Sequence, residues 1–378
     1  MGRPHGAPER PDVAYALTIM DKGKVLMAMS GGIDSTVAAM LLTEQGYKLE
    51  GVTFRSWDSI SKACMERETG CCSVDSIFEA KHVAENLGFN HQILDVRELF
   101  RNTVISNFIS EYLNGRTPNP CVVCNKIIKW GALCNLADSL GCQFIATGHY
   151  ARIGSQNGRY FISKGVDTTK DQSYFLWQVP HEKLSRTLFP LGNYTKQQVR
   201  QMAAERGYVK LSQKRESQEI CFVPDNNYRN FLRGNSPEYT AVGPGNFVST
   251  DGRVLGQHKG FPNYTIGQRK GLEIALGQPM YVSHIDAARN TVTLGTRADL
   301  LSRSLTASNY NFTKIDAPAS PIEVTARVRY RSKGCQATVA IRDGKAVVEF
   351  SEPVESVSPG QSVVFYQGDD MIGGGIID

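Results

Sequence analysis

The sequence predicts an α/β protein with an N-terminal doubly wound parallel sheet, a small, mostly β central domain and a C-terminal β-barrel. Two observations lead to this fold class. From residue 24 to about 147, buried strand-like runs alternate with amphipathic helical segments, which is typical of a parallel sheet covered by helices on both faces. From about residue 246, short β-branched and aromatic runs broken by glycine indicate all-β structure.

The N-terminal alternation begins with a buried strand, a glycine-rich turn and an amphipathic helix. Three further strand-like runs and two helical runs continue it. We expect strands at 24–29, 49–54, 91–96 and 144–147, and helices at 35–45, 77–87 and 127–140. Parallel strands joined by helices place their carboxyl ends, and the loops that follow them, at one edge of the sheet.

The C-terminal half divides into two β-rich parts. Strand-like runs at 277–282 and 291–295 form the first, and four runs after Leu301 are enough for a small closed barrel. The barrel strands are expected at 322–330, 337–341, 346–350 and 362–366. We therefore expect a disordered tail at 1–21, the α/β domain at 22–215, the central domain at 216–301 and the barrel at 302–378.

Composition limits the class of protein. The chain has 378 residues, of which 41% are hydrophobic and 21% charged, as in multidomain globular proteins. Since no run approaches the roughly 20 apolar residues of a membrane span and the first twenty lack a secretory core, we expect a cytoplasmic protein without a membrane partner. Nine cysteines in such a chain indicate reduced thiols rather than a disulfide framework.

The glycine-rich turn has the sequence Ser30-Gly31-Gly32-Ile33-Asp34-Ser35. Its backbone amides and the following helix N-terminus can converge on an anion such as pyrophosphate. It lacks the lysine of GxxxxGK[ST], so it is not the P-loop of ATPases. Although a glycine pair alone is more often structural, the whole string resembles the PP-loop of ATP pyrophosphatases, which cleave ATP to AMP and pyrophosphate.

The resemblance to ATP pyrophosphatases implies an ATP site. The implied ATP-binding residues are Ala28, Met29, Ser30, Gly31, Gly32, Ile33, Asp34, Ser35, Phe54 and Gly148. Asp34 is expected to bind Mg²⁺, because a hard cation on phosphate oxygens prefers a carboxylate ligand.

Two stretches contain cysteines with a chemical context. In Thr117-Pro118-Asn119-Pro120-Cys121-Val122-Val123-Cys124, a CxxC pair precedes a predicted helix, whose dipole lowers the pKa of nearby thiols. The alternatives are structural thiols or half of a zinc site. Cys221 follows Gln218-Glu219-Ile220 at the predicted domain junction, where a lone cysteine is more often a small buried side chain. The remaining six cysteines are expected to be structural.

Together with ATGHYAR, KDQSYFLW and NYTIGQRKGL, these motifs resemble the tRNA 2-thiouridylase family over residues 24 to about 370. The resemblance implies that Cys221 receives persulfide sulfur and that Cys124 resolves it. Asn119, Pro120 and Cys121 match the segment beside the target base. Relatives have an aspartate at the position of Cys121, so this candidate third thiol leaves the proton-transfer step unassigned.

The same resemblance implies a set of tRNA contacts. They are His149, Lys170, Asp171, Gln172, Arg329, Tyr330 and Gln361. In addition, Arg327, Arg329, Arg331 and Lys333 alternate along a predicted strand, which would present several positive charges to phosphate on one face.

The family resemblance predicts a tRNA-uridine 2-sulfurtransferase that uses ATP and Mg²⁺ to adenylate the 2-carbonyl oxygen of the wobble uridine in the anticodon loop. It implies a persulfide donor protein and an external reductant. One alternative retains this reaction but has a [4Fe-4S] cluster on Cys121, Cys124 and Cys221 as the sulfur carrier. Another is a non-catalytic RNA-binding adaptor, which the intact SGGIDS and cysteine motifs disfavour.

Overall fold

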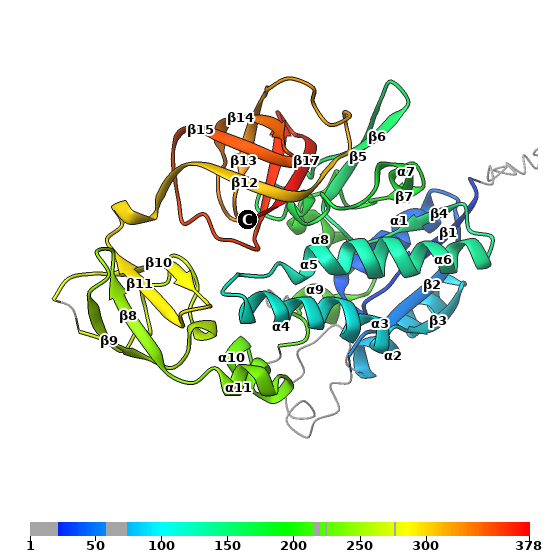
Figure 1. Ribbon diagram of the computed structural model, residues 1–378. Helices are drawn as coiled ribbons and strands as arrows, with labels where there is room; N and C mark the ends of the chain where they lie inside the picture. The colour runs from blue at the N-terminus through cyan, green and yellow to red at the C-terminus, as the bar shows by residue number, and fades with distance from the viewer. Residues whose placement is uncertain (1–21, 58–73, 215–219, 224, 276) are drawn as a thin grey trace, which may run out of the picture.

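The computed structural model describes residues 22–57, 74–214, 220–223, 225–275 and 277–378 (Figure 1). Its three sheets follow one another along the chain, except that one hairpin of the first part joins the last sheet. The predicted fold class is confirmed, with a parallel-sheet domain, a small β domain and a closed barrel. Within the described residues, no helix is long and apolar enough to cross a membrane.

The first sheet has the strand order β3-β2-β1-β4-β7, and all of its pairings are parallel. Its strands are β1 (Lys24–Ala28), β2 (Lys48–Arg55), β3 (Asn90–Asp95), β4 (Phe144–Ala146) and β7 (Thr187–Leu188). Since β1 lies between β2 and β4, the order reverses there. Ligands of doubly wound sheets bind outside the carboxyl ends of the strands at such a switch point.

Side chains of β1 alternate between two hydrophobic clusters. Val25 and Met27 pack in the cluster that contains α1 (Ile33–Glu44), α2 (Val74–Leu87) and α8 (Lys196–Glu205). Leu26 packs on the opposite face, against Trp130, Leu133 and side chains of the barrel. Both faces of the sheet are therefore covered, as the near-continuous apolar character of the strand predicts.

Two long helical runs contain π-helical stretches. The first comprises α3 (Arg97–Phe100), η1 (Arg101–Ile105) and α4 (Ser106–Leu113), and the second α5 (Pro120–Cys124), η2 (Asn125–Ala132) and α6 (Leu133–Ser139). The predicted helix at 127–140 thus begins earlier, at Pro120, whose fixed φ suits the first turn of a helix.

The central sheet has the strand order β10-β11-β8-β9. Its strands are β8 (Gly245–Ser249), β9 (Val254–His258), β10 (Tyr281–Asp286) and β11 (Thr291–Gly295), and α10 (Tyr228–Asn235) and α11 (Pro237–Ala241) precede them. Phe247, Val282, Val292 and Leu294 are fully buried and form its core with neighbouring aromatic residues.

The barrel has six strands in the order β12-β15-β14-β13-β16-β17 and is closed by pairing of β12 with β17. They are β12 (Leu301–Phe312), β13 (Ile322–Arg327), β14 (Cys335–Arg342), β15 (Lys345–Glu355), β16 (Ser362–Gln367) and β17 (Asp370–Ile377). The hairpin of β5 (Ala151–Gln156) and β6 (Arg159–Lys164), from the α/β part of the chain, extends this sheet beside β17.

The prediction that Arg327, Arg329, Arg331 and Lys333 lie on one strand is wrong. β13 ends at Arg327, and the other three residues lie in its connection to β14. The Arg327 guanidinium donates hydrogen bonds to the carbonyl oxygens of Tyr330 and Ser332, further along this connection. Gly334 has a φ of +88°. These contacts close a turn that the alternating sequence pattern does not reveal.

Candidate active site

The SGGIDS turn lies between β1 and the N-terminus of α1, as predicted. Ser35 Oγ accepts from the Ser30 N–H at 3.2 Å and donates to Gly32 O at 3.0 Å, so the serines brace the turn internally. Gly31 has a φ of +62°, and a side chain there would overlap the Ser76 backbone. The turn therefore needs glycine and points the α1 N-terminus toward the sheet's carboxyl edge, an arrangement that suits an anion.

The loop after β4 lies directly against this turn. A Cβ atom on Gly148 would be 2.9 Å from the Asp34 carbonyl carbon and 3.0 Å from the Ser35 nitrogen, so only glycine permits this approach. Phe54 lies near the carboxyl end of the neighbouring strand β2 and is half-buried. The structure thus brings the predicted ATP-binding residues to one edge of the sheet, at the switch point between β1 and β4.

The Asp34 carboxylate is held by two side chains. Lys196 Nζ lies 2.8 Å and 2.9 Å from its two oxygens, and the Tyr150 hydroxyl donates to Oδ1 at 2.7 Å. Lys196 is only 7% exposed, so its ammonium group is largely desolvated beside the turn. Asp34 has the oxygen donors that Mg²⁺ prefers, but in this arrangement they already neutralise a cation.

Sequence reasoning missed Lys196 and Tyr150. Both come from segments far along the chain, and an isolated lysine in a sequence normally indicates a solvated surface charge. The one local signal is the capping box of Thr195 and Gln198, which marks the start of α8 and thereby the position of Lys196 at its first residue.

The CxxC pair opens the helical run that begins with α5. Cys121 is exposed and Cys124 half-buried. Surrounding protein raises the pKa of Cys121 above its ordinary value, and the nearby Lys129 ammonium opposes that shift only partly. The expectation that the helix dipole lowers the pKa of this thiol is therefore wrong for Cys121.

Cys221 is exposed, but its neighbours are anchored. Phe222 is 1% exposed and meets the rings of Phe100 and Phe108 edge-on, with centroids 5.7 Å and 5.1 Å away. Ile220, Phe222 and Val223 belong to the same hydrophobic cluster as Cys124 and Val123, and Phe54 borders it. The two cysteine segments, far apart in sequence, therefore meet in one cluster beside the carboxyl edge of the sheet.

Comparison with known proteins gives three matching family models. Residues 23–225 match the tRNA methyl transferase HUP domain, 230–296 the tRNA methyl transferase PRC-barrel domain and 302–377 the aminomethyltransferase beta-barrel domain. The tRNA-specific 2-thiouridylase MnmA of Amoebophilus asiaticus is 52% identical over 95% of this chain and 96% of its own length. The chain belongs to the tRNA-specific 2-thiouridylase family.

A second relative of the same name, from Cytophaga hutchinsonii, is 49% identical over 94% of this chain and 97% of its own length. Among solved structures, a 4-thiouridine synthetase–RNA complex with bound ATP is similar with a TM-score of 0.36 and 18% identity. That match covers 58% of this chain and 52% of the other. The assignment of the chain to this family rests on the first two relatives and on the HUP-domain match, which spans more than half of the chain.

The iron–sulfur alternative is not supported for this chain. Among the described residues, which include Cys121, Cys124 and Cys221, no group of three or more His, Cys, Asp or Glu side chains is placed to hold a metal ion. Three thiolates converging on one cluster would form such a group. Cys134 and Cys142 are buried, as expected for structural thiols, whereas Cys64, Cys71 and Cys72 lie outside the described residues.

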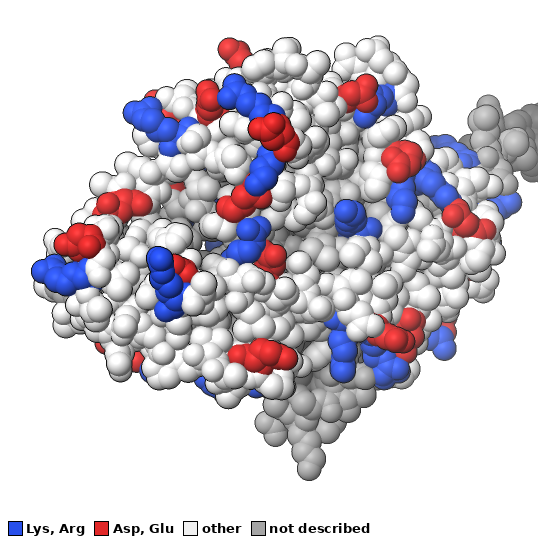
Figure 2. Space-filling view, in the orientation of Figure 1, with Lys and Arg blue, Asp and Glu red and all other residues white. Residues whose placement is uncertain are grey.

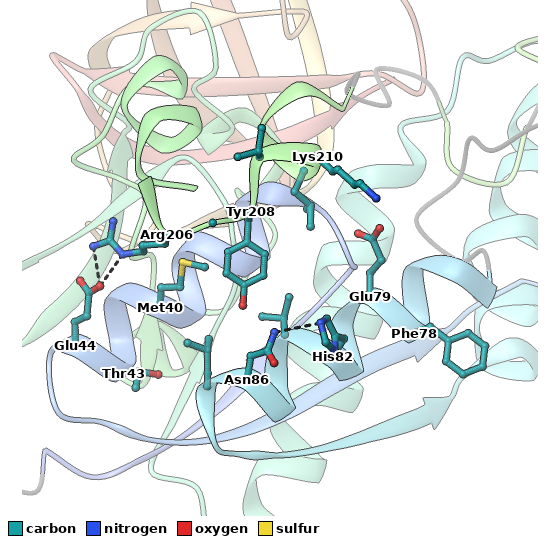
Figure 3. A pocket seen from close by; sticks show the side chains of 15 residues that line it. Met40, Thr43, Glu44, Phe78, Glu79, His82, Asn86, Arg206, Tyr208 and Lys210 are labelled. Carbon is teal, nitrogen blue, oxygen red and sulfur yellow. Dashed lines mark hydrogen bonds and ion pairs between the residues drawn. The ribbon is translucent and has the colours of Figure 1, made fainter. Parts of the chain in front are cut away.

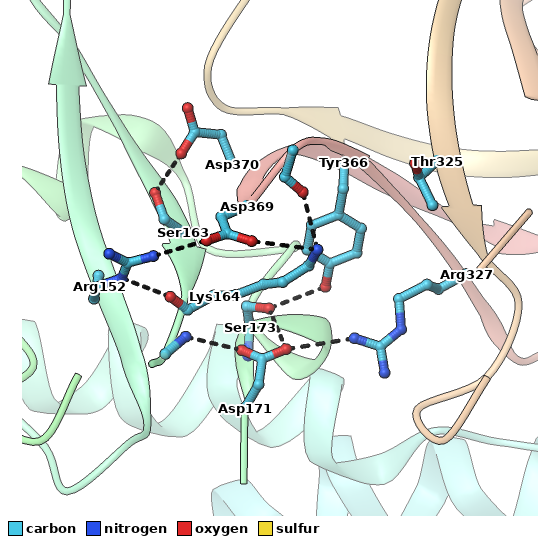
Figure 4. Close-up of polar contacts among 12 residues, drawn as sticks. Arg152, Ser163, Lys164, Asp171, Ser173, Thr325, Arg327, Tyr366, Asp369 and Asp370 are labelled. Atoms are coloured by element: carbon cyan, nitrogen blue, oxygen red, sulfur yellow. Dashed lines mark hydrogen bonds and ion pairs between the residues drawn. The ribbon is translucent and has the colours of Figure 1, made fainter. Parts of the chain in front are cut away.

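Several of the predicted tRNA contacts are bonded within the protein, among them His149, Asp171 and Gln172. His149 is 8% exposed; its Nε2 lies 3.2 Å from Lys129 Nζ and its Nδ1 2.7 Å from Thr147 Oγ1. Burial and the Lys129 charge hold the pKa of His149 well below its usual range, so the ring is neutral and accepts from Lys129. Asp171 is buried, accepts from Ser173 at 3.0 Å and pairs with Arg327 at 3.4 Å (Figure 4). Gln172 Oε1 accepts from the Tyr150 N–H at 3.1 Å.

The other predicted tRNA contacts lie nearer the surface. Arg329 is exposed, while Lys170, Tyr330 and Gln361 are half-buried. Tyr330 packs on Phe175 with ring centroids 4.5 Å apart, which docks the β13–β14 connection on the α/β part. Figure 2 shows basic and acidic side chains interspersed over one face of the molecule, without a patch of a single sign.

A groove in the described part of the protein lies away from these residues. It has a volume of about 1070 Å³ and lies among α1, α2 and the turn from α8 to α9 (Val209–Gln213), with Met40, Val83 and Tyr208 in its lining (Figure 3). None of its lining residues is a predicted site residue.

Proposed function

We propose that this chain catalyses ATP-dependent 2-thiolation of the wobble uridine in tRNA. The observation that carries the proposal is the hydrophobic cluster in which the Cys124 and Cys221 segments meet beside Phe54. This cluster supports a role for both thiols near the SGGIDS turn, because Phe54 lies near the carboxyl end of β2, the strand beside β1. Family membership makes tRNA the expected substrate.

The first step is activation of the uridine. ATP binds with its phosphates against the SGGIDS amides and the α1 N-terminus. Asp34 would hold Mg²⁺, which supplies neutralisation of phosphate charge when bound. The uridine 2-oxygen attacks the α-phosphorus, the bond to pyrophosphate breaks, and the N3 proton of the base passes to solvent water. Lys196 lies beside Asp34 and would offset the negative charge on the phosphates as the bond to pyrophosphate breaks.

The second step transfers sulfur. The terminal sulfur of a Cys221 persulfide bonds to C2, and the C2–O bond to AMP breaks. The Cys124 thiolate then attacks the inner sulfur on Cys221, forming a disulfide and freeing 2-thiouridine, which regains a proton at N3. In the alternative order, the attack by Cys124 precedes transfer and releases hydrosulfide. Either order needs a persulfide donor protein and a reductant that reopens the disulfide.

The test is product analysis with purified protein, tRNA, Mg-ATP and a persulfide source. We expect pyrophosphate release that depends on tRNA, together with 2-thiouridine in digested tRNA, measured by coupled assay and mass spectrometry. A methylated uridine in place of 2-thiouridine, or tRNA binding without pyrophosphate release, would refute the proposal.

A further inference from the structure

The segment that leads into the CxxC pair is bonded to the barrel. The Thr117 N–H donates to Pro359 O at 2.8 Å. In return, Gln361 Nε2 donates to Thr117 O at 3.1 Å and to Pro118 O at 2.9 Å. The backbone immediately before Asn119 is therefore fixed by residues from the far end of the sequence.

Two further contacts tighten this junction. Arg116 donates through Nη2 to Ile377 O at 3.0 Å and through Nε to Glu111 at 2.8 Å, which links the end of β17 to α4. Gly360 has a φ of +86°, and a side chain there would come within 2.5 Å of the Glu111 carboxylate. The barrel backbone thus approaches the cysteine segment as closely as glycine allows, next to the C-terminus in Figure 1.

Gln361 is itself held firmly by the barrel. Its carbonyl accepts from the Ile377 N–H at 2.8 Å, and its N–H donates to Ser358 O at 3.1 Å. The next residue, Ser362, accepts from Trp177 Nε1 at 2.9 Å and, through its backbone, from the Tyr174 hydroxyl at 2.8 Å. Because these hydrogen bonds fix the backbone of Gln361, its side-chain amide holds the cysteine loop at a position set by the barrel and does not move with the loop.

We propose that Gln361 is a positioning residue: from the barrel, it fixes the backbone of Thr117 and Pro118 and thereby places Asn119, Pro120 and Cys121. Pro118 and Pro120 restrict the backbone between the two hydrogen bonds and the cysteine, so a shift at Thr117 moves Cys121 with it. The assignment rests on the proposed function only in taking this loop to lie beside the target base. It differs from a direct contact between Gln361 and tRNA.

The same barrel connection also contains the anchor of Arg329. Arg329 Nη2 donates to Glu355 O at 3.1 Å and to Ser356 O at 2.9 Å. These carbonyls begin the short connection from β15 to β16 that ends in Pro359, Gly360 and Gln361. The Arg329 side chain is therefore bonded to the same connection that holds the cysteine loop.

The experiment measures thiol reactivity in the full-length protein without tRNA. Iodoacetamide labelling is followed residue by residue by mass spectrometry in the parent, Gln361→Glu and Gln367→Glu. The first variant replaces the donating amide by an isosteric carboxylate that repels both carbonyls. The control makes the same change at the other end of β16, where Gln367 Nε2 donates to Glu323 O at 3.2 Å inside the barrel.

We expect Gln361→Glu to label about two- to tenfold faster at half-buried Cys124, the range for loss of one or two ordinary hydrogen bonds. Labelling at Cys335 in the barrel and all rates in Gln367→Glu should match the parent. Unchanged labelling at Cys124, or an equal rise in both variants, overturns the assignment. This result is independent of whether the protein thiolates tRNA.

Activity and a second variant complete the test. With the parent's tRNA affinity retained within about twofold, Gln361→Glu should lower kcat for thiolation by about tenfold or more, as misplacement of a reacting group does. A loss of tRNA affinity with unchanged kcat and labelling would identify a direct RNA contact instead. If labelling of buried Cys134 shows that Gln361→Glu has unfolded, Gln361→Ser removes the same bonds without adding charge, and the same readings apply.

Discussion

Asp34 and Lys196 form an ion pair at the SGGIDS turn, where ATP is proposed to bind. Their ion pair at 2.8 Å joins the SGGIDS turn to the start of α8 and is half shielded from water. The carboxylate could be predicted from the turn motif, because the motif is contiguous in sequence. Its lysine partner could not, since the fold alone brings it within reach.

Asp34→Ala should abolish tRNA-dependent pyrophosphate release, because it removes both the oxygen donors for Mg²⁺ and the partner of Lys196. Loss of the ion pair with Lys196 should also lower the free energy of unfolding by about 1–3 kcal/mol. Coupled pyrophosphate assays and chemical denaturation measure the two effects. Glu44→Ala, which breaks the Glu44–Arg206 pair at the other end of α1, is the control and should keep parental release. Release by Asp34→Ala at the parental rate would remove the assignment.

Cys121 should react as a neutral thiol at physiological pH. Desolvation by the surrounding protein raises the pKa of the Cys121 thiol, so the thiolate forms only as the pH rises past a value above the usual 8.5 or so. The rate of iodoacetamide labelling at Cys121, followed by mass spectrometry against pH, should therefore have its midpoint above that value. A neutral thiol donates a proton but does not accept one, which would leave Cys121 unsuited to be a general base. A labelling midpoint below about pH 8 would contradict this and indicate that Cys121 forms a thiolate near physiological pH.

At the scale of elements, the PP-loop strand, turn and helix lie where the sequence predicts them, because strand burial, glycine spacing and helix periodicity are all local signals. The β13–β14 connection shows where such signals fail. Its alternating charges look like a strand, but Val328 is buried and Tyr330 packs on Phe175, so tertiary contacts decide its path. Arg329 consequently projects from a turn and not from a row of cations.

Arg329→Ala should weaken tRNA binding and reduce the slope of log affinity against log salt by about one, because one phosphate contact is lost. ATP affinity should remain unchanged, since Arg329 lies on the barrel. Filter binding or fluorescence anisotropy at several salt concentrations measures the slope. Arg342→Ala, an exposed arginine at the end of β14, serves as a control. Equal slopes for Arg329→Ala and the parent would argue against phosphate binding there.

At the scale of the whole molecule, the α/β part and the barrel share one core. Trp177 and Tyr174 are fully buried in a cluster with Val364, Tyr366 and Met371 of the barrel. Composition and texture could predict that the α/β domain and the barrel exist beside a central domain, and the boundaries of all three remain predictions. Composition and texture could not reveal this shared core, because no pattern in the segment around Trp177 indicates which residues it packs against.

Trp177→Ala should lower the free energy of unfolding by about 3–5 kcal/mol, the cost of removing a buried tryptophan. Calorimetry and circular dichroism should show the α/β part and the barrel destabilised together, in one transition. Phe78→Ala is a control, because Phe78 is 64% exposed and its loss should change stability little. Two separate transitions, with that of the barrel unchanged, would contradict a shared core.

The central claim, that a Cys221 persulfide supplies the sulfur and Cys124 resolves it after adenylation, is tested most directly by a single turnover. Persulfidated protein is mixed with tRNA and Mg-ATP without reductant, and pyrophosphate, 2-thiouridine and cysteine-linked peptides are quantified together. The account predicts equal amounts of pyrophosphate, 2-thiouridine and a Cys124–Cys221 disulfide. Cys124→Ser and Cys221→Ser should each release pyrophosphate but form no free 2-thiouridine, whereas Cys335→Ser should match the parent. Full thiolation by Cys221→Ser would contradict the account.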